Sequence, residues 1–367
     1  MFTLLALVLA SALVAIAWTV AFNEARIDET AGALRRSFYV AEGGAAATIR
    51  NWPRSYNFIA PYPVDSVAIP SDAPTSWLTP PHGGGGYRGY LYRLNDELYL
   101  LSTQGRVGAP LPALHRLGIL LRLEPPRSDV RAALEAGGSA RIVGRVQISG
   151  NDSAPSAWSC DLRDTSKAGV AAESITVLPT PSGRIAGSPP TSITPPEGQP
   201  ERLRAWAMLR DVLLAEPNHA LAGAGVPRVE PVSMGRHCAI AVVTNWGDAN
   251  QPGAPCGGFY PVIHLTGDAT LVDISGQGTL IVDGSLTLTG ATRWNGIILA
   301  GGNLTLRGTG PTFHVWGAMA AAGDAVLEAD SLASPLEVTY SKCAVTNALY
   351  SASRAVPLTS RSAIEAF

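Results

Sequence analysis

Four cysteines are the residues of this chain best suited to forming covalent bonds. Cys238 and Cys256 flank a loop rich in Gly and Pro, and a bond between them would close about 19 residues and contribute about 3 kcal/mol of stability. Cys160 and Cys343 remain, and by elimination they would form a second bond. All four lie beyond the apolar N-terminal segment, in the part that would face an oxidising periplasm, where disulfides persist. We therefore expect two disulfides.

Metal and cofactor chemistry have little support in the sequence. A zinc site is the alternative use of two of these cysteines, but no CxxC or HxxxH pair gives the usual ligand spacing among its candidate ligands His237, Cys238, Cys256 and His264. The chain has only two lysines, Lys167 and Lys342, and neither follows a glycine, which excludes a phosphate-binding P-loop. No GxSxG or HExxH motif gives a histidine a catalytic role. We expect no metal and no cofactor.

Paired carboxylates are the remaining catalytic hypothesis. Asp268 and Asp283 lie in a segment of short strands, and two carboxylates on one face of such a structure can cleave a polysaccharide. The sequence holds no carboxylate cluster beyond what its turns need. We therefore expect no enzymatic activity.

Composition narrows the function classes further. Charged residues make up 15% of the chain, which also holds 38 Gly and 28 Pro, and this balance favours turn-rich β structure with linkers. The formal net charge is −2, so there is no broad basic surface for phosphate groups. Nucleic acid is not an expected partner.

An internal repeat organises residues 261–328. Four lines share a short strand, a turn and a second short strand: PVIHLTGDATL, TLIVDGSLTL, GIILAGGNLTL and GAMAAAGDAVL. The turn glycines recur at intervals of 17, 18 and 21 residues, at Gly267, Gly284, Gly302 and Gly323. A run of hairpins is the alternative, but only the stacked coils of a β-solenoid require nearly equal intervals, so we expect a solenoid over residues 261–340.

A short polar residue follows each turn glycine, at Asp268, Ser285, Asn303 and Asp324. In stacked coils these side chains would lie above one another at one corner. Calcium binding is one use of such a stack, but the GGxGxD repeat of calcium-binding β-rolls is absent. Capping of the turn backbone by these side chains is the expected role.

The first 22 residues carry no charge. A helix of that length reaches about 33 Å, enough to cross a hydrocarbon core of about 30 Å. A cleaved signal peptide is the alternative, with Ala10-Ser11-Ala12 as a candidate cleavage site, but the run is long and lacks a basic start. We expect a membrane helix with the C-terminal part in the periplasm.

The same helix can continue, because no proline occurs before Pro53. Beyond residue 22 charged residues are interleaved with apolar ones, and the apolar ones recur at helical spacing, at Ile27, Ala31, Leu34, Phe38, Ala41, Ala45 and Ile49. The sequence therefore predicts one helix of about 50 residues with a single apolar face.

The N-terminal apolar helix, the NEAR junction and the stretch RRSFYVAEGGAA at residues 35–46 resemble the start of PilX-type minor pilins and of the K-type pseudopilins of type II secretion. In those proteins a segment similar to ArxxAFYAAEAGLE ends the first part of the long pilin helix. The resemblance covers about the first 52 residues, and Leu5 in place of a glutamate favours a minor over a major subunit. It implies packing against neighbouring pilin helices through Phe2, Leu5, Leu9, Ile16, Ile27, Leu34, Phe38 and Ala41.

The rest of the chain predicts short elements joined by linkers. We expect a hairpin centred on Asn95-Asp96, a short helix over residues 128–136 and an amphipathic helix over residues 201–215. The expected organisation is a helix (1–52), a Pro-rich connector (53–81), a small α+β unit (82–180), a Pro-rich linker (181–200), a helix with the disulfide loop (201–260), the β-solenoid (261–340) and a C-terminal helical cap (341–367).

The sequence thus predicts a mixed, mainly β protein with a long N-terminal transmembrane and pilin-like helix, a small α+β unit, and a C-terminal β-solenoid. The expected function is that of a minor pilin-like subunit of a type IV pilus or a related secretion filament, acting in assembly, priming or adhesion. Its expected partners are other pilin or pseudopilin subunits, the lipid bilayer and a surface or glycan ligand, with exposure outside the cell once a filament is assembled. The alternative is a membrane-tethered solenoid that binds or cleaves polysaccharide.

Overall fold

The structure is a computed structural model, which describes residues 2–59, 63–81, 84–108, 112–155, 158, 160, 165–178, 183–329, 334–358 and 363–366. The side chains of residues 2–10, 196, 199, 200, 202 and 363–366 lie outside that description. The chain is 41% strand and 21% helix, with one long N-terminal helix and several parallel sheets. The mixed, mainly β class expected from composition is confirmed.

The chain divides into two compact units, and their boundary differs from the domain boundaries expected from the sequence. Unit 1 comprises Met1–Leu123 and Ala355–Phe367, and unit 2 comprises Glu124–Arg354. The expected α+β unit over residues 82–180 is therefore wrong, because its first strands belong to unit 1 and its last strands to unit 2. The expected C-terminal segment 341–367 is likewise shared between the two units.

Unit 1 combines helix α1 (Phe2–Arg50) with an antiparallel sheet. The strand order is β1 (Val67–Ile69), β2 (Gly86–Arg93), β3 (Leu98–Val107), β4 (Ala113–Glu124) and β24 (Arg354–Pro357), and β25 (Ala363–Ala366) also pairs with β4. The expected hairpin is confirmed as β2 and β3, where Asn95 Oδ1 accepts hydrogen bonds from the backbone N–H groups of Glu97 (2.9 Å) and Leu98 (2.8 Å). A short 3₁₀ helix, η1 (Arg54–Phe58), follows α1 in the connector.

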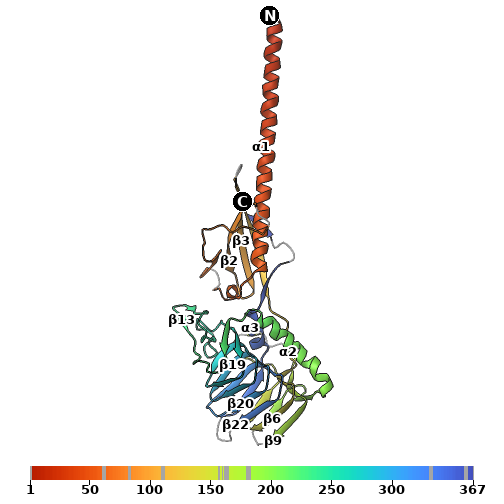
Figure 1. Cartoon of the computed structure of the whole chain (residues 1–367), viewed down its shortest axis with the longest axis vertical. Coiled ribbons are helices and arrows are strands. Elements are labelled where there is room, and N and C mark those ends of the chain that lie inside the picture. The colour runs from red at the N-terminus through yellow and green to blue at the C-terminus, as the bar shows by residue number, and fades with distance from the viewer. Residues whose placement is uncertain are drawn as a thin grey trace. The chain divides into compact units, whose positions relative to one another are not determined.

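The second half of α1 packs on β2 and β3 (Figure 1). A Cβ atom at Gly105 of β3 would collide with the Ser37 carbonyl oxygen and the Ala41 nitrogen, and one at Gly44 of α1 would collide with the ring of Tyr87. The helix backbone therefore approaches the strands more closely than larger side chains would allow. The buried face of α1 is accordingly made mostly of small residues: Ala33, Ser37, Val40, Ala41, Gly44, Ala45 and Thr48.

Unit 2 is built from parallel strands that alternate between two sheets (Figure 1). In one sheet β15 (Val262–Thr266), β17 (Ser275–Val282), β19 (Thr292–Ala300) and β21 (Phe313–Ala321) are successive neighbours. In the other, β16 (Ala269–Val272), β18 (Leu286–Thr289), β20 (Leu304–Gly308) and β22 (Ala325–Ala329) follow the same order. Each repeat is thus one coil, and the parallel pairing excludes the run of hairpins.

Strands from earlier in the sequence extend this stack beyond the last repeat. β5 (Ala132–Ala136) pairs with β21 and β6 (Ser139–Gly144) with β22, both parallel, and β8 (Ala168–Ala172) and β9 (Ser174–Leu178) add the next coil. The short helix expected over residues 128–136 is therefore wrong. Its apolar run lies fully buried as a strand, where pairing with β21 and β8 outweighs the helix propensity of AALEA.

The Pro-rich segment 181–200 is not a free linker. β10 (Arg184–Ala186) pairs with β7 (Val146–Ser149), and β11 (Thr191–Ile193) pairs with β8, both in parallel. β7 in turn pairs with β23 (Leu336–Tyr340), which lies beside β21. At the opposite end of the stack, β12 (His219–Ala222) pairs with β15.

The core of unit 2 lies between the two sheets. Along β21 buried and partly exposed residues alternate from Phe313 to Trp316, which places Val315 inside and His314 outside. Trp246 and Trp294 are fully buried and meet edge to face with ring centroids 6.2 Å apart. The expected amphipathic helix is confirmed as α2 (Gln199–Leu214), which follows η2 (Pro196–Gly198) and buries Trp206, Leu209 and Leu213.

Helix α3 (Lys342–Tyr350) lies against β17, β19 and β21. Three glycines in register, Gly278, Gly296 and Gly317, have positive φ values of 100°, 141° and 137°, which glycine adopts readily. A Cβ at Gly296 would collide with the Gly278 carbonyl oxygen, and one at Gly317 would collide with the Gly296 carbonyl oxygen, so these glycines let neighbouring coils stack closely. A Cβ at Gly296 would also lie 3.1 Å from the Ala348 Cβ of α3. The expected cap over the open end of the coils is therefore corrected, because α3 covers the side of the stack.

Candidate functional site

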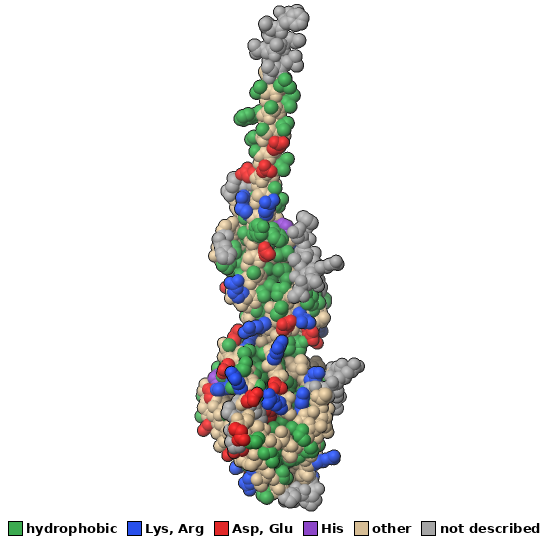
Figure 2. All heavy atoms as spheres, turned by 90° about the vertical axis from the view of Figure 1, so that its right-hand side faces the viewer, with side chains coloured by type: hydrophobic (Ala, Val, Ile, Leu, Met, Phe, Trp, Pro, Cys, Tyr) green, Lys and Arg blue, Asp and Glu red, His purple; other side chains and the backbone are tan. Residues whose placement is uncertain are grey.

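Helix α1 presents large apolar side chains that unit 1 leaves uncovered. We define the apolar helix surface as eight residues whose side chains are 46% to 74% exposed: Leu13, Val14, Ile16, Trp18, Val20, Phe22, Ile27 and Leu34. Figure 2 shows hydrophobic side chains gathered along this part of the helix. An apolar patch of this kind marks a site of contact with a protein or a lipid.

Charged side chains interrupt the apolar helix surface beyond Phe22. Glu24, Arg26, Asp28 and Glu29 are all exposed, with both signs represented within two turns. The polar groups within the surface are satisfied locally, since the hydroxyl of Thr19 donates to the Ala15 carbonyl at 3.0 Å. The surface therefore changes along the helix from wholly apolar to a narrow apolar stripe between charges.

The residues expected to pack against neighbouring helices differ in how exposed they are. Ile16, Ile27 and Leu34 are exposed, as that role requires. Ala41 is fully buried on the chain's own sheet, where the Thr103 hydroxyl donates to its carbonyl at 3.1 Å, and Phe38 meets His115 of β4 edge to face at 5.2 Å. These two are corrected as internal packing residues.

The side chains of three further expected packing residues, Phe2, Leu5 and Leu9, lie outside the described residues. In the portion of the chain that is described, no helix combines the length and the apolar character needed to span a bilayer. The expected membrane segment at residues 1–22 includes ten residues whose side chains are not described.

The polar residues of the repeat form a continuous ladder across the turns of unit 2. Asp268 Oδ1 accepts a hydrogen bond from the backbone N–H of Ser285 (2.7 Å), and Ser285 Oγ accepts one from Asn303 (3.1 Å). Asn303 Oδ1 accepts one from Asp324 (2.9 Å), and Asp324 Oδ1 accepts one from Ser139 (2.7 Å). Backbone capping, the expected role of these side chains, is thus what their hydrogen bonds do.

The turn glycines are explained by the same ladder. A Cβ at Gly284 would collide with Asp268 Oδ1, and one at Gly323 would collide with Asn303 Oδ1. At Gly302 a Cβ would lie 2.7 Å from Ser285 Oγ. Gly267, at the first turn, has a positive φ of 77°. Gly284, Gly302 and Gly323 therefore lie where the capping side chain of the preceding coil needs room.

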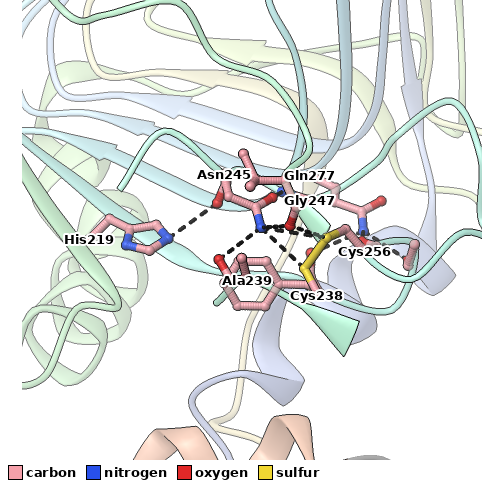
Figure 3. Close-up of a disulfide and its surroundings, with 10 residues drawn as sticks. His219, Cys238, Ala239, Asn245, Gly247, Cys256 and Gln277 are labelled. Atoms are coloured by element: carbon pink, nitrogen blue, oxygen red, sulfur yellow. Dashed lines mark hydrogen bonds between the residues drawn. A yellow bond between two sulfur atoms is a disulfide. The ribbon is translucent and has the colours of Figure 1, made fainter. Parts of the chain in front are cut away.

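Both disulfides expected from the sequence are present, Cys160–Cys343 and Cys238–Cys256. The second lies beside Asn245, which is fully buried at the start of the NWGD segment (Figure 3). Asn245 Nδ2 donates to the carbonyls of Val232 and Ala239, each at 3.0 Å. The disulfide and the asparagine together tie the loops that precede β15.

Two further buried side chains link this loop region to the coils (Figure 3). Gln277 of β17 donates through Nε2 to the carbonyls of Gly257 (2.8 Å) and Phe259 (3.0 Å). His219 of β12 lies with its Nε2 3.2 Å from the Asn245 carbonyl oxygen, and burial lowers the pKa of this histidine. These contacts tie the loop region to β12 and β17.

The carboxylates of the catalytic hypothesis are engaged elsewhere. Asp268 belongs to the turn ladder. Asp283 binds Arg210 at 2.6 Å and His264 at 2.9 Å. Burial alone would raise the pKa of Asp283, but the hydrogen bonds from His264 and Arg210 lower it overall. His264, a candidate ligand of the alternative zinc site, is therefore held by a carboxylate, and the described residues contain no cluster suited to a metal ion.

One group of residues was missed by the sequence reasoning. Arg293, His314, Trp316 and Glu337 come from β19, β21 and β23, and they line a cavity of about 540 Å³ on the outward face of unit 2. Their signal in the sequence is the polar position that alternates with apolar ones in each strand. Only the parallel register brings them together.

Comparison of the chain with protein-family models, with curated proteins and with solved structures gives no match in any of the three.

Proposed function

We propose that the chain is a minor pilin-like subunit of a type IV pilus or a related type II secretion-like filament, which acts without catalysis in assembly, priming or adhesion. One observation carries the proposal. Within unit 1, the second half of α1 is packed on an antiparallel sheet through small residues, whereas the apolar helix surface, which runs from Leu13 to Leu34, is 46% to 74% exposed.

The distribution of side-chain size along α1 supports one role in packing on the sheet and another in contacting neighbouring subunits. Residues of the buried face are small and allow backbone contact with β3, which holds unit 1 together. The exposed residues are large, including Trp18 and Phe22, and large apolar side chains stabilise by burial in an assembly. A filament core made from the helices of neighbouring subunits would bury them.

The apolar run also indicates where the subunit is held before assembly. We propose that residues 1–22 hold it in the inner membrane, because they carry no charge, and that both units face the periplasm. The two disulfides fit an oxidising compartment. We infer that the stacked coils of unit 2 form a β-solenoid, whose size suits a filament tip better than a repeating shaft on steric grounds.

Recovery in sheared filaments tests the proposal. Ile27→Asp places a charge on the apolar helix surface, and Arg36→Asp places the same residue nine positions on, about half a turn around the helix. We expect wild type and Arg36→Asp to be recovered in sheared filaments to within about twofold of each other, and Ile27→Asp to be reduced at least about tenfold, equivalent to about 1.4 kcal/mol.

The total amount of each variant in the cells controls for folding, since Ile27 is 66% exposed. Absence of the wild-type chain from sheared filaments of a cell that makes them would overturn the proposal. Equal recovery of Ile27→Asp and Arg36→Asp would overturn the role of the apolar helix surface.

A further inference from the structure

A row of outward side chains, which we call the file, runs across the strands of unit 2. None of them belongs to the turn ladder or to the apolar helix surface. The parallel register places its members side by side on β17, β19, β21, β23, β7 and β10, as Ser275, Arg293, His314, Glu337, Gln147 and Arg184. Five strand-to-strand steps give the file a length of about 24 Å. A site of this shape suits a chain-like ligand better than a compact one.

Two adjoining cavities follow the file. The larger, about 540 Å³, is lined by Arg293, His314 and Trp316, and the smaller, about 280 Å³, is lined by Gln147, Asn151 and Arg184. Glu337 lines both. We call the two cavities together the polar groove. Their volumes lie in or near the range usual for ligand sites.

The larger cavity holds the cation Arg293, which forms no ion pair within the described part of the chain, beside the carboxylates of Asp273 and Glu337. The Arg293 guanidinium lies over the ring of Trp316, 4.9 Å from its centroid, and the buried Arg293 Nε has no hydrogen-bond acceptor among the described residues. A guanidinium with free donors binds a carboxylate through two parallel hydrogen bonds. Trp316 beside it is half-buried, and the ring of His314 stacks on the ring of Trp316 with centroids 3.2 Å apart.

The neighbouring polar groups are held in fixed positions. His314 lies with Nδ1 2.9 Å from a Glu337 carboxylate oxygen and Nε2 3.2 Å from the Thr339 hydroxyl. Burial, with a smaller effect of Arg293, lowers the pKa of His314 to about 3, so the ring is neutral at pH 7. The carboxylate oxygens of Glu337 can accept hydrogen bonds from hydroxyl groups at the junction of the two cavities.

The pairing of the strands beneath the groove favours one of two kinds of chain-like ligand. An extended peptide gains affinity by pairing its backbone with a free strand edge. Here β19, β21, β23 and β7 already pair on both sides, so a peptide on this face would leave its backbone groups without strand partners. A sugar chain needs no such edge, because its hydroxyl groups bind side-chain carboxylates, amides and hydroxyls directly.

We propose that the polar groove binds an acidic oligosaccharide, with a sugar carboxylate on Arg293. Gln147, Asn151 and Glu337 bind hydroxyl groups of the next units of the chain. Arg184, at the far end of the file, provides the second cation, which fits a ligand with repeated carboxylates. The site goes beyond filament incorporation and does not depend on it, because binding is measured on the isolated chain.

The test is calorimetric titration of the full chain in detergent with three probes: tetragalacturonate, a mannuronate oligomer and a hyaluronan oligomer. We expect saturable binding of at least one probe. Its carboxyl methyl ester, which has the same shape without the charge, is expected to bind at least about tenfold more weakly, the effect of losing one charge-assisted pair. Tetraglutamate serves as the acidic peptide control.

Two matched variants locate the site. Arg293→Gln removes the groove cation, and Arg307→Gln removes an exposed arginine on β20 in the other sheet. We expect at least about tenfold weaker binding for Arg293→Gln and a change within about twofold for Arg307→Gln.

Circular dichroism confirms that both variants are folded. No saturable binding of any probe up to about 10 mM would overturn the inference, as would equal binding by Arg293→Gln and wild type. Tetraglutamate binding as tightly as the best oligosaccharide would overturn the sugar class in favour of an acidic peptide.

Discussion

Gly105→Ala on β3 probes the contact between α1 and its sheet with a single added carbon. The Cβ at residue 105 would lie 3.0 Å from the Ala41 Cα and closer still to the Ser37 carbonyl oxygen and the Ala41 nitrogen. These are backbone atoms of a regular helix, so no side chain can rotate away. The helix as a whole must move back from β3.

The size of the effect follows from that displacement. Carbon atoms in contact are separated by about 3.5–4.0 Å, so α1 must withdraw by roughly 1 Å, and a gap of this size forfeits a quarter to a half of the dispersion attraction across it. Overpacking of this kind costs about 1–3 kcal/mol. We expect a loss of about 2 kcal/mol, equal to an increase of about 30-fold in the opening of unit 1.

Native-state hydrogen exchange of the full chain measures this opening. The informative amides are those of residues 33–48 in α1 and of β3, because both are released when the helix leaves the sheet. Gly108→Ala is the matched control, since Gly108 follows the same strand and a Cβ there meets no atom within 4 Å.

The control variant is expected to exchange at the wild-type rate or slightly more slowly, because alanine restricts the unfolded chain by about 0.4–1 kcal/mol. Faster exchange confined to Gly105→Ala is the predicted result. Equal protection in the two variants would refute the close backbone contact on which the division of α1 rests.

Three further outcomes are expected for unit 2, all measured by urea unfolding of the full chain with hydrogen exchange to assign the transition. Asp324→Ala removes a turn cap and is expected to cost about 1 kcal/mol, whereas Asp324→Asn, which keeps Oδ1, should cost less than half of that; equal losses would contradict capping. Replacing Cys238 and Cys256 together by serine should cost about 3 kcal/mol through the loop they close, and an unchanged midpoint would contradict that role. Burial lowers the pKa values of His219 and His314, so the unfolded chain binds protons at a higher pH than the folded chain does. The free energy of unfolding should therefore be greatest above about pH 6.5 and decline below it. His219→Gln should reduce this decline.

The repeat shows what the sequence can predict about this fold. Nearly equal spacing of Gly267, Gly284, Gly302 and Gly323 has a physical cause, because the last three make room for the cap of the preceding coil and Gly267 has a positive φ. That local requirement appears in the sequence as a regular spacing of glycines. The next coil was missed although Gly138-Ser139 continues the same pattern, because it lies 185 residues before the Asp324 that caps it. Periodicity along the chain cannot reveal a coil that the topology brings from elsewhere.

The helix shows a different limit. The interval of three and four residues on α1 predicts an apolar face, but two partners compete for that face. The chain's own sheet takes small residues such as Ala41, and the large residues Ile27 and Leu34 stay exposed. All three residues count as apolar in the helical periodicity, whereas the close approach of Gly105 separates them by size. The groove on unit 2 escaped prediction because its residues share a strand register and no sequence motif.

Site-specific crosslinking tests the central claim most directly, that the apolar helix surface of α1 contacts the helices of neighbouring subunits. Ile27→Cys places the reactive group on that surface, and Glu29→Cys places it two residues on, about 160° around the helix. We predict that Ile27→Cys in sheared filaments forms crosslinks to the N-terminal helix of another subunit, at least several-fold more than Glu29→Cys does. Recovery of Ile27→Cys only as an uncrosslinked species, or equal capture by both positions, would contradict the account.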